Sequence, residues 1–407
     1  MGLRVAVIGA GVLGASIAGR LARRGHTVTL IEATNVGAGT TGTSFAWINA
    51  NEKRPRDYFE LNLAGMAAHR QALADGRAAP WLHITGRLQW AAGGAGQAAL
   101  DAKDERLRAW GYAVTRLGRT DVLNLEPDLL LEGVDEVSYY REEGYLLPRL
   151  YLDHLLRECE ELRVELRTGS PVVGFDGAGG RLRAARMASS DAVTADVFVS
   201  CCGRWTSEVV ARAGLSIPLV PAGTGSAAVG LLGATAPVAT RLQRVVSSPQ
   251  LNLRPDGGAR ILLQALDLEA TVQPESPPGI DSPLATELLT RARQLLRRFD
   301  GAYLESLRVG VRALPVDGRS VVGWVPGVEG LYVVVTHSGI TLAPVLGELA
   351  AREVGCGANE PLLRPFRPSR FTPMGPTSGN RTSRHRAVGP IAGTVPRIAG
   401  GLSSVLP

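Results

Sequence analysis

The sequence predicts an α/β protein in which a Rossmann-like nucleotide-binding domain is interleaved with an α+β domain that contains an antiparallel sheet. Three observations support this fold class. A glycine-rich turn follows the first apolar run, in "VAVIGAGVLG". Short runs of alternating apolar and polar residues, typical of half-buried antiparallel strands, begin near Gly86. Continuous apolar runs that end at glycine return near residues 197 and 331.

The first elements form a βαβ unit around the glycine-rich turn. The expected strand, helix and strand are Leu3–Ile8, Ala15–Arg24 and Thr27–Ile31. Gly9 permits the tight turn, Gly11 lets the backbone approach a pyrophosphate, and Gly14 lets the helix pack closely on the sheet. Glu32, at the end of the second strand, can accept hydrogen bonds from ribose hydroxyls and would repel a 2′-phosphate. The pattern therefore predicts a dinucleotide site, for which NAD and FAD are equally suitable.

A second loop of small residues, "GAGTTGTS", follows this unit and favours FAD over NAD. Its glycines permit close backbone approach, and its hydroxyl side chains can donate hydrogen bonds. A longer cofactor that is inserted deeply into the protein needs such a second loop beyond its ribose. An NAD-dependent dehydrogenase would leave this loop without a role.

The remaining elements follow in the order that an interleaved fold requires. Helices are expected at Pro55–Asp75, Gln97–Trp110 and Pro283–Phe299, and a strand–turn–helix unit at 330–355. We expect the FAD-binding domain to comprise residues 1–85, 145–212 and 310–357, and the substrate-binding domain to comprise residues 86–144 and 213–309. Residues 358–407 are expected to form a basic, disordered tail.

Composition and charge exclude several classes of protein. The 407 residues carry a net charge of +6, but the stretch from Arg364 onward contains seven arginines and no acidic residue. The basic character therefore belongs to a solvated tail, and we expect no nucleic-acid partner. The longest uncharged stretch, Ile217–Thr240, contains three prolines and four glycines. It predicts strand–loop–strand and no transmembrane segment, with peripheral membrane contact as the alternative.

The cysteines and the N-terminus predict a cytoplasmic protein. Cys159, Cys201, Cys202 and Cys356 form no CxxC pair and are accompanied by no histidine cluster, so no metal site is expected. The apolar N-terminus is interrupted by glycines at motif spacing, which indicates a strand and turn and not a signal peptide.

At the level of longer motifs, the chain resembles the FAD-dependent D-amino acid oxidase superfamily, and within it the branch of glycine oxidase and the D-amino acid dehydrogenase small subunit. The motifs "GAGTTGTS", "GRLQWA", "EGYLLPRLYLDHL", "CCGRWTSEV", "GVRALPVDGRSVVG" and "THSGITLAPVLGELAA" occur in the expected order. The resemblance covers residues 3 to 355. It implies a GR2-type FAD-binding domain with FAD as the cofactor. No cysteine or histidine lies in an unmistakable flavin-attachment motif, so we expect the FAD to be bound non-covalently.

The resemblance also implies the residues that contact the cofactor. "CGRW" matches a signature beside FAD, two valines match the contact with the adenine end, and the start of the last helix matches the turn near the flavin pyrimidine carbonyl. The full set of expected FAD contacts is Gly9, Gly11, Val12, Leu13, Gly14, Glu32, Ala33, Gly39, Thr40, Thr41, Thr43, Ser44, Val172, Val173, Cys202, Gly203, Trp205, Gly339, Ile340, Thr341 and Leu342.

Two residues are candidates for the chemistry. The resemblance implies that Arg312 holds a substrate carboxylate, for which the guanidinium offers a planar fork. His337, in "THSG", is expected to tune the flavin or to touch the substrate.

The chain also departs from its relatives. Leu251 and Asn252 stand where relatives often place a substrate-facing tyrosine, and Gln264 stands where a glycine is common. One of Tyr139, Tyr140 and Tyr145 could compensate.

The function implied is oxidation of the C–N bond of a D-amino acid, glycine or an N-alkyl amino acid. Hydride transfer to flavin N5 would give an imino acid and, after hydrolysis, a 2-oxo acid. The partners expected are a small carboxylate substrate and an acceptor, either oxygen or a quinone-linked carrier; the oligomeric state stays open. Two alternatives remain at this stage: oxidation of a 2-hydroxy acid with His337 as the base, and a catalytically inactive flavin-binding accessory protein.

Overall fold

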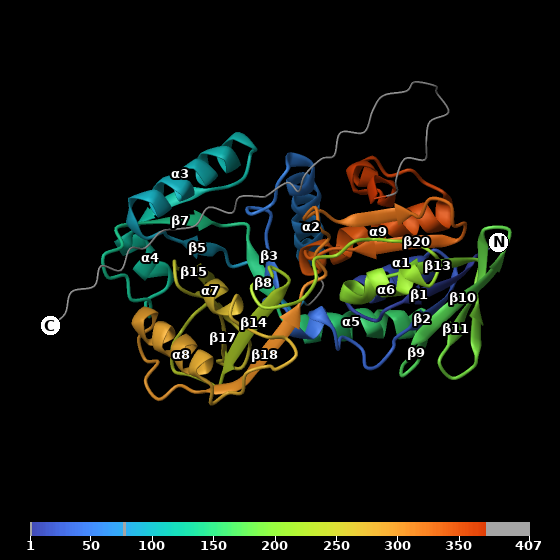
Figure 1. The fold of residues 1–407 in the computed structure, drawn as a ribbon. Coiled ribbons are helices and arrows are strands. Elements are labelled where there is room, and N and C mark those ends of the chain that lie inside the picture. Colours follow the sequence, from blue (N-terminus) through green and yellow to red (C-terminus); the bar gives the residue numbers. More distant parts are fainter. Residues whose placement is uncertain (1, 76–78, 372–407) are drawn as a thin grey trace, which may run out of the picture. The chain divides into compact units, whose positions relative to one another are not determined.

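A computed structural model describes residues 2–75 and 79–371 of the chain, and its first layer is a six-stranded sheet (Figure 1). The strand order is β19-β20-β13-β1-β2-β9, and every neighbouring pair is parallel except β19 and β20. The strands are β1 (Arg4–Ile8), β2 (Thr27–Ile31), β9 (Glu165–Arg167), β13 (Val197–Ser200), β19 (Val321–Trp324) and β20 (Leu331–Val335).

Both faces of this sheet are buried, which explains why its strands are continuous apolar runs. In β1, Val5 and Val7 pack with helices α1 (Val12–Arg23), α2 (Arg56–Ala74), α5 (Pro148–Glu161) and α9 (Gly339–Cys356). Ala6 and Ile8 point to the opposite face. There they pack with α6 (Thr206–Ala211) and the small sheet of β10 (Val172–Ala178), β11 (Arg181–Met187) and β12 (Ala192–Thr194).

The second layer is an eight-stranded sheet in the order β18-β14-β17-β16-β15-β5-β7-β6, with a separate apolar core. All its pairs are antiparallel except β15 and β5. Its strands are β5 (Arg87–Gln89), β6 (Thr115–Gly118), β7 (Glu136–Tyr140), β14 (Val229–Thr235), β15 (Val245–Ser247), β16 (Asn252–Pro255), β17 (Ile261–Gln264) and β18 (Leu304–Val311).

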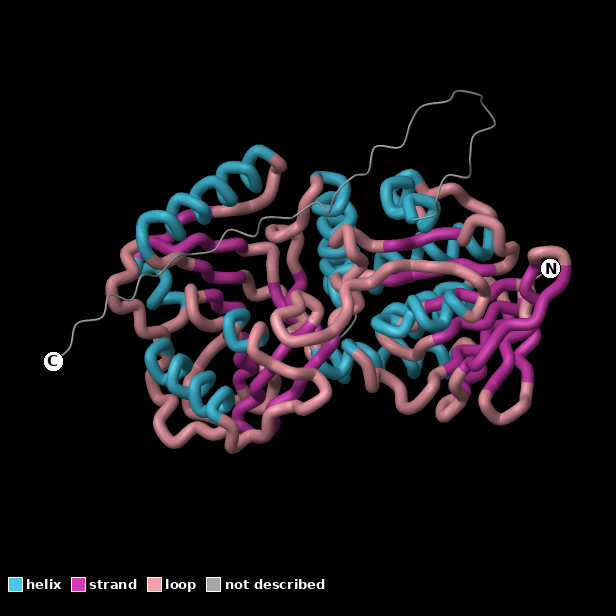
Figure 2. The backbone as a smooth tube through the Cα atoms, in the orientation of Figure 1, coloured by secondary structure: helices cyan, strands magenta, loops and turns pink. Residues whose placement is uncertain are grey.

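Helices α3 (Gly93–Ala109), α4 (Arg119–Leu125), α7 (Leu266–Glu269) and α8 (Pro283–Leu295) accompany the second sheet, as the cyan and magenta tubes of Figure 2 show. The predicted fold class, a Rossmann-like domain interleaved with an antiparallel-sheet domain, is confirmed. The first sheet draws its strands from residues 4–31, 165–200 and 321–335, and the second from 87–140 and 229–311. The domain boundaries themselves stay a prediction.

A short sheet and helix α2 connect these layers. The short sheet has the order β3-β8-β4, from β3 (Trp47–Ile48), β8 (Gly144–Leu146) and β4 (Leu82–His83). In α2, a Cβ on Gly65 would lie 2.4 Å from the Thr341 carbonyl oxygen, so the helix crosses the start of α9 at close range. His69 Nε2 lies 2.9 Å from the Ile340 carbonyl oxygen. Helix α2 therefore fixes the N-terminal turn of α9.

Some sequence expectations differ from the structure at element ends. Helix α1 begins at Val12, inside the glycine motif, and α3 begins at Gly93. In the stretch Ile217–Thr240 the structure has one strand, β14, instead of two, because two prolines fall in the loop before it and Pro237 falls just after it. None of the described helices is long and apolar enough to cross a membrane.

The expectation of a disordered tail from residue 358 is wrong for residues 358–371. Two 3-10 helices, η3 (Pro361–Phe366) and η4 (Pro368–Phe371), pack on the first layer and bury Leu363 and Phe366. Arg367 Nη1 donates to Glu353 Oε2 at 2.6 Å, and Arg370 pairs with Asp317 at 2.7 Å. These arginines neutralise carboxylates of the fold and are not part of a solvated basic run. The remainder of the expected tail lies outside the described residues.

We expect Gly14→Ala to destabilise the protein by about 3 kcal/mol or more, because its Cβ would lie 1.8 Å from the Gly9 carbonyl oxygen, where rigid backbone leaves no relief. Gly94→Ala, in α3, is the matched control: nothing lies within 4 Å of its Cβ, so a change of at most about 1 kcal/mol is expected. Denaturant unfolding followed by circular dichroism measures both, and equal stability of the two variants would contradict the close helix–strand contact.

Candidate active site

The carboxyl ends of β1, β13 and β20 open onto a cavity of about 500 Å³. Strand β1 has β2 on one side and β13 on the other, so the chain changes direction across the sheet at this point. Such a switch point is where open α/β sheets bind ligands. The cavity extends from Glu32 at the end of β2 to the first turn of α9, and strands β14, β17 and β18 of the second sheet also contribute to its wall.

The glycine-rich turn forms one wall of the cavity. Gly9 has φ +106°, and a Cβ there would lie 2.5 Å from the Cys201 carbonyl oxygen, so only glycine fits. The Glu32 carboxylate holds this turn: Oε2 accepts from the Ala10 N–H, and Oε1 accepts from the Thr34 N–H, each at 3.0 Å. Helix α1 starts directly after the turn, with its N-terminal N–H groups toward the cavity.

The second loop packs on the first and narrows the cavity. It forms a single 3-10 turn, η1 (Thr40–Thr43). The Val12 N–H donates to Thr41 Oγ1 at 3.3 Å, and the Gly37 N–H donates to the Ala10 carbonyl at 3.1 Å. These two hydrogen bonds join the small-residue loops into one cradle, so the second loop lines the same cavity as the first.

The same loop also contacts the second sheet. Thr40 Oγ1 donates to the Val311 carbonyl at 2.7 Å, and Arg308 Nη1 donates to the Gly42 carbonyl at 2.9 Å. A Cβ on Gly310 would lie 2.5 Å from Thr43 Oγ1, so β18 needs glycine where it passes the loop. Loop η1 therefore fixes the position of β18, and with it Arg312, relative to the glycine turn.

The structure brings most of the expected cofactor contacts together around this cavity. Those that line it are Gly9, Gly11, Val12, Leu13, Glu32, Ala33, Gly39, Thr40, Thr41, Thr43, Ser44, Val172, Cys202, Gly203, Trp205, Gly339, Ile340 and Thr341.

Three expected contacts do not line the cavity, and the geometry explains each. Gly14, in the first turn of α1, packs directly on the Gly9 carbonyl. Leu342 is fully buried in the apolar core beneath the first sheet. Val173 is 48% exposed, whereas its neighbour Val172 is buried and faces the cavity, because successive residues of β10 point to opposite faces.

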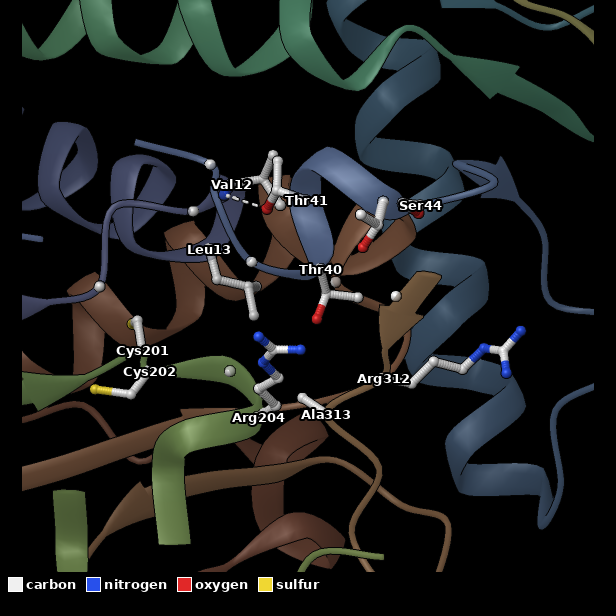
Figure 3. A pocket seen from close by; sticks show the side chains of 18 of the residues that line it. Val12, Leu13, Thr40, Thr41, Ser44, Cys201, Cys202, Arg204, Arg312 and Ala313 are labelled. Carbon is white, nitrogen blue, oxygen red and sulfur yellow. Dashed lines mark hydrogen bonds between the residues drawn. The ribbon is translucent and has the colours of Figure 1, made fainter. Parts of the chain in front are cut away.

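Sequence reasoning missed Arg204, which lies in the middle of the cavity. Figure 3 shows its guanidinium beneath Leu13 and Thr40. The guanidinium carbon lies 4.1 Å from the ring centroid of Trp205, and that indole in turn packs on Gly39. Arg204 stands within the "CGRW" motif, but the abundance of arginine in this chain obscured it.

The first turn of α9 closes the far end of the cavity. Thr336, His337, Ser338 and Gly339 line it, and Tyr58 Oη supports the turn at 2.8 Å from Ser338 Oγ. His337 Nδ1 is buried and has no hydrogen-bond partner among the described residues. Burial, together with the charges of Lys53 and Arg312, lowers the pKa of His337 to about 3. The imidazole is therefore neutral at physiological pH and has a free polar atom beside the cavity.

Arg312 lines the cavity, but its terminal donors are already used. Nη2 donates to both carboxylate oxygens of Glu269, at 2.9 and 2.8 Å. Nη1 donates to the carbonyls of Ala227, at 3.0 Å, and Val229. Figure 3 shows the side chain directed away from Arg204 and Thr40. The guanidinium fork that was expected to receive a substrate carboxylate is bound instead to a carboxylate of the protein.

Gln264, one of the departures noted in the sequence, stabilises this ion pair. Its Nε2 donates to Glu269 Oε1 at 2.7 Å, and the Leu231 N–H donates to the same oxygen at 3.1 Å. Asn252 lies opposite Gln264 in the sheet. Glutamine in place of glycine thus supplies a hydrogen-bond donor to a buried carboxylate.

None of Tyr139, Tyr140 and Tyr145 lines the cavity, so none compensates for the missing tyrosine. Tyr140 Oη donates to Asp104 at 2.7 Å, and Tyr145 stacks on His83.

A buried carboxylate outside the cavity positions one of its walls. Glu143 accepts hydrogen bonds from Trp47 Nε1 at 2.8 Å, Asn51 Nδ2 at 2.6 Å and Tyr112 Oη at 2.8 Å. Trp47 lines the cavity, and the Arg87 guanidinium carbon lies 4.0 Å from its ring centroid. Burial raises the pKa of Glu143 to about 7.

The family model and the similar proteins indicate the same family. The family model described as DAO, FAD dependent oxidoreductase, matches residues 4–353. Glycine oxidase from Geobacillus kaustophilus is 26% identical over 370 residues, which cover 85% of this chain and 91% of that protein. Glycine oxidase from Bacillus licheniformis is 24% identical over 358 residues, with the same two coverages.

Solved structures agree on the fold. The crystal structure of the Geobacillus kaustophilus glycine oxidase has a TM-score of 0.75 at 23% identity and covers 90% of this chain and 98% of that one. L-amino acid deaminase from Proteus vulgaris has a TM-score of 0.78 at 18% identity, covering 91% and 94%. The cofactor that this family carries is FAD, which agrees with the cradle formed by the two loops.

We expect Arg312→Met to lower the free energy of unfolding by about 3 kcal/mol, because it leaves the Glu269 carboxylate buried without its partner. The double variant Arg312→Met/Glu269→Gln removes the charge as well, so it should be less destabilised than the single variant. Urea unfolding of both, with Glu269→Gln alone to complete the cycle, measures the coupling. A single variant as stable as wild type would contradict the ion pair.

Glu143 predicts a pH dependence of stability. Its pKa is higher in the folded protein than in the unfolded chain, so its contribution is complete below about pH 4.5 and is lost as the pH rises through about 7, a loss of about 3 kcal/mol. Glu143→Gln stays neutral at every pH and should remove this part of the slope, whereas Glu142→Gln, a more exposed neighbour, should keep it. Thermal unfolding between pH 5 and 8 provides the comparison; identical profiles for wild type and Glu143→Gln would refute the assignment.

Proposed function

Since this chain belongs to the DAO family of FAD-dependent oxidoreductases, we propose that it oxidises the C–N bond of a small amino acid or N-alkyl amino acid. The observation that carries the proposal is the continuous cavity from Glu32 to the first turn of α9, with both small-residue loops on its wall. The relatives named as glycine oxidases and the structural neighbour named as an L-amino acid deaminase support an amino acid as substrate.

The residues present fit FAD along the whole cavity. Glu32 has acceptor capacity for the ribose hydroxyls of the adenosine half, and Val172 offers an apolar contact near it. The N–H groups at the start of α1 and the hydroxyls of η1 suit the pyrophosphate, and the Arg204 guanidinium supplies an opposite charge for it. We propose that the flavin half lies toward Thr336–Thr341.

FAD supplies a two-electron acceptor for the α-hydrogen of the substrate, and the resulting imino acid is hydrolysed to a 2-oxo acid. Helix α9 is 18 residues long, and its N-terminal turn faces the cavity. The positive end of its dipole stabilises negative charge that develops there during reduction. The role of α9 is therefore electrostatic, and α2 holds it in place through Gly65 and His69.

His337 favours amine oxidation over oxidation of a 2-hydroxy acid. An alcohol must lose its hydroxyl proton to a base, whereas an amine that binds unprotonated needs no base. An imidazole with a pKa of about 3 is a weak base. We propose that His337 Nδ1 accepts a hydrogen bond from the substrate and does not remove a proton during turnover.

We expect the purified protein to be yellow and its visible flavin absorbance to be bleached anaerobically by at least one member of a panel of D-amino acids, glycine, N-alkyl glycines, cyclic imino acids and L-amino acids. The matched 2-hydroxy acids should leave the absorbance unchanged. Bleaching by a hydroxy acid alone would identify the alternative reaction. A yellow protein that no member reduces would favour the catalytically inactive accessory protein.

A further inference from the structure

We propose that Lys53, in place of Arg312, binds the anionic group of the substrate. The inference rests on the proposed function, because it assigns a residue to the same cavity. The first observation concerns the hydrogen-bond donors of Arg312. Both terminal nitrogens of Arg312 are engaged, Nη2 with the Glu269 carboxylate and Nη1 with two backbone carbonyls. A substrate carboxylate could bind these two nitrogens only after it displaces Glu269 from Arg312.

The Glu269 carboxylate is held too firmly for such an exchange. It is 4% exposed, and its Oε1 accepts from Arg312, Gln264 and the Leu231 N–H at once. Displacement would leave a buried carboxylate and three donors without partners, which is strongly unfavourable. The ion pair is therefore a neutral part of the cavity wall.

Lys53 is the cation that remains at the flavin end. It lines the cavity, is half-buried, and has no ion pair within 4 Å among the residues that the structure describes. The neighbouring carboxylate, Glu52, is bound to Lys103 at 2.9 Å. The other cationic residues of the wall are Arg204 and Arg212, and Arg204 lies in the middle of the cavity, where it stacks on Trp205.

The position of Lys53 suits a substrate at the α9 turn. Its Nζ lies 6.0 Å from the ring centroid of Tyr58, and Tyr58 Oη is bonded to Ser338. Its charge acts on His337, whose Nδ1 is buried and unpartnered. Lys53 and His337 thus line the same end of the cavity, beside the start of α9.

This arrangement defines the class of substrate. With the Arg312–Glu269 pair neutral and His337 uncharged, Lys53 contributes one positive charge to the substrate end. The charge of Lys53 matches one anionic group of the substrate, a carboxylate. The same charge disfavours a protonated amine nearby, so it promotes binding of the unprotonated amine that oxidation requires. Lys53 would serve both recognition and reactivity.

The test is binding of benzoate, a carboxylate that cannot be oxidised, to the FAD-containing protein, with benzamide as its neutral isostere. Isothermal titration calorimetry at constant ionic strength measures both ligands without turnover. Lys53→Met and Lys53→Arg are compared with Arg54→Met, which removes a positive charge from the exposed next residue, outside the cavity. Arg312→Met/Glu269→Gln tests the rival anchor.

We expect wild type to bind benzoate more tightly than benzamide, and Lys53→Met to weaken benzoate about 10- to 100-fold while benzamide is unaffected. Lys53→Arg should recover part of the loss, and Arg54→Met and the double variant should stay within about threefold of wild type. The proposal is overturned if wild type does not distinguish the two ligands, or if benzoate affinity survives Lys53→Met and is lost in the double variant.

Failure of this inference is separable from failure of the proposed function. If an amino acid bleaches the flavin but the affinity for benzoate does not depend on Lys53, the proposed reaction is supported and the assignment of Lys53 is wrong. If benzoate depends on Lys53 but no amino acid bleaches the flavin, the anion site stands and the reaction is wrong.

Discussion

The hydrogen bonds between the two small-residue loops are the interaction on which the site depends. Thr41 Oγ1 and the Ala10 carbonyl receive donors from Val12 and Gly37 respectively, which closes η1 over the glycine turn. Because η1 also bonds to β18 through Thr40, the nucleotide cradle and the second sheet share one support. Through this loop, residues that are remote in sequence, such as Glu32 and Arg312, line one cavity. Loss of its contacts would therefore separate the glycine turn from β18 of the second sheet.

Charge in the cavity is distributed in three regions. At the nucleotide end, the Glu32 carboxylate is satisfied by backbone N–H groups and Arg204 offers a cation for phosphate. In the wall, Arg312 and Glu269 neutralise each other. At the α9 end, the helix dipole and Lys53 create a positive potential next to a neutral His337. With the flavin and the substrate placed as proposed, this gradient would favour an anionic substrate and a reduced, negatively charged flavin at the same end.

The sequence predicted those features that depend on local spacing. The turn at Gly9, Gly11 and Gly14 needs only a strand before it and a helix after it, and the strands of the first sheet are recognisable because both faces are buried. The ion pair of Arg312 was not predictable, since Glu269 is 43 residues away and no periodicity connects the two. The proposed role of Lys53 was not predictable for the same reason. Lys53 lies in the loop before α2, and that loop reaches the cavity because α2 packs on α9, a contact that no local sequence pattern indicates.

In the proposed arrangement, FAD lies across the two joined loops with its flavin at the start of α9. A crystal structure of the protein with its bound cofactor would test this arrangement. We expect the pyrophosphate between the first turn of α1 and η1, the adenosine ribose at Glu32, and the flavin against Gly339–Thr341. A cofactor bound in the reverse direction, or a flavin outside this cavity with the Val12–Thr41 hydrogen bond intact, would contradict it.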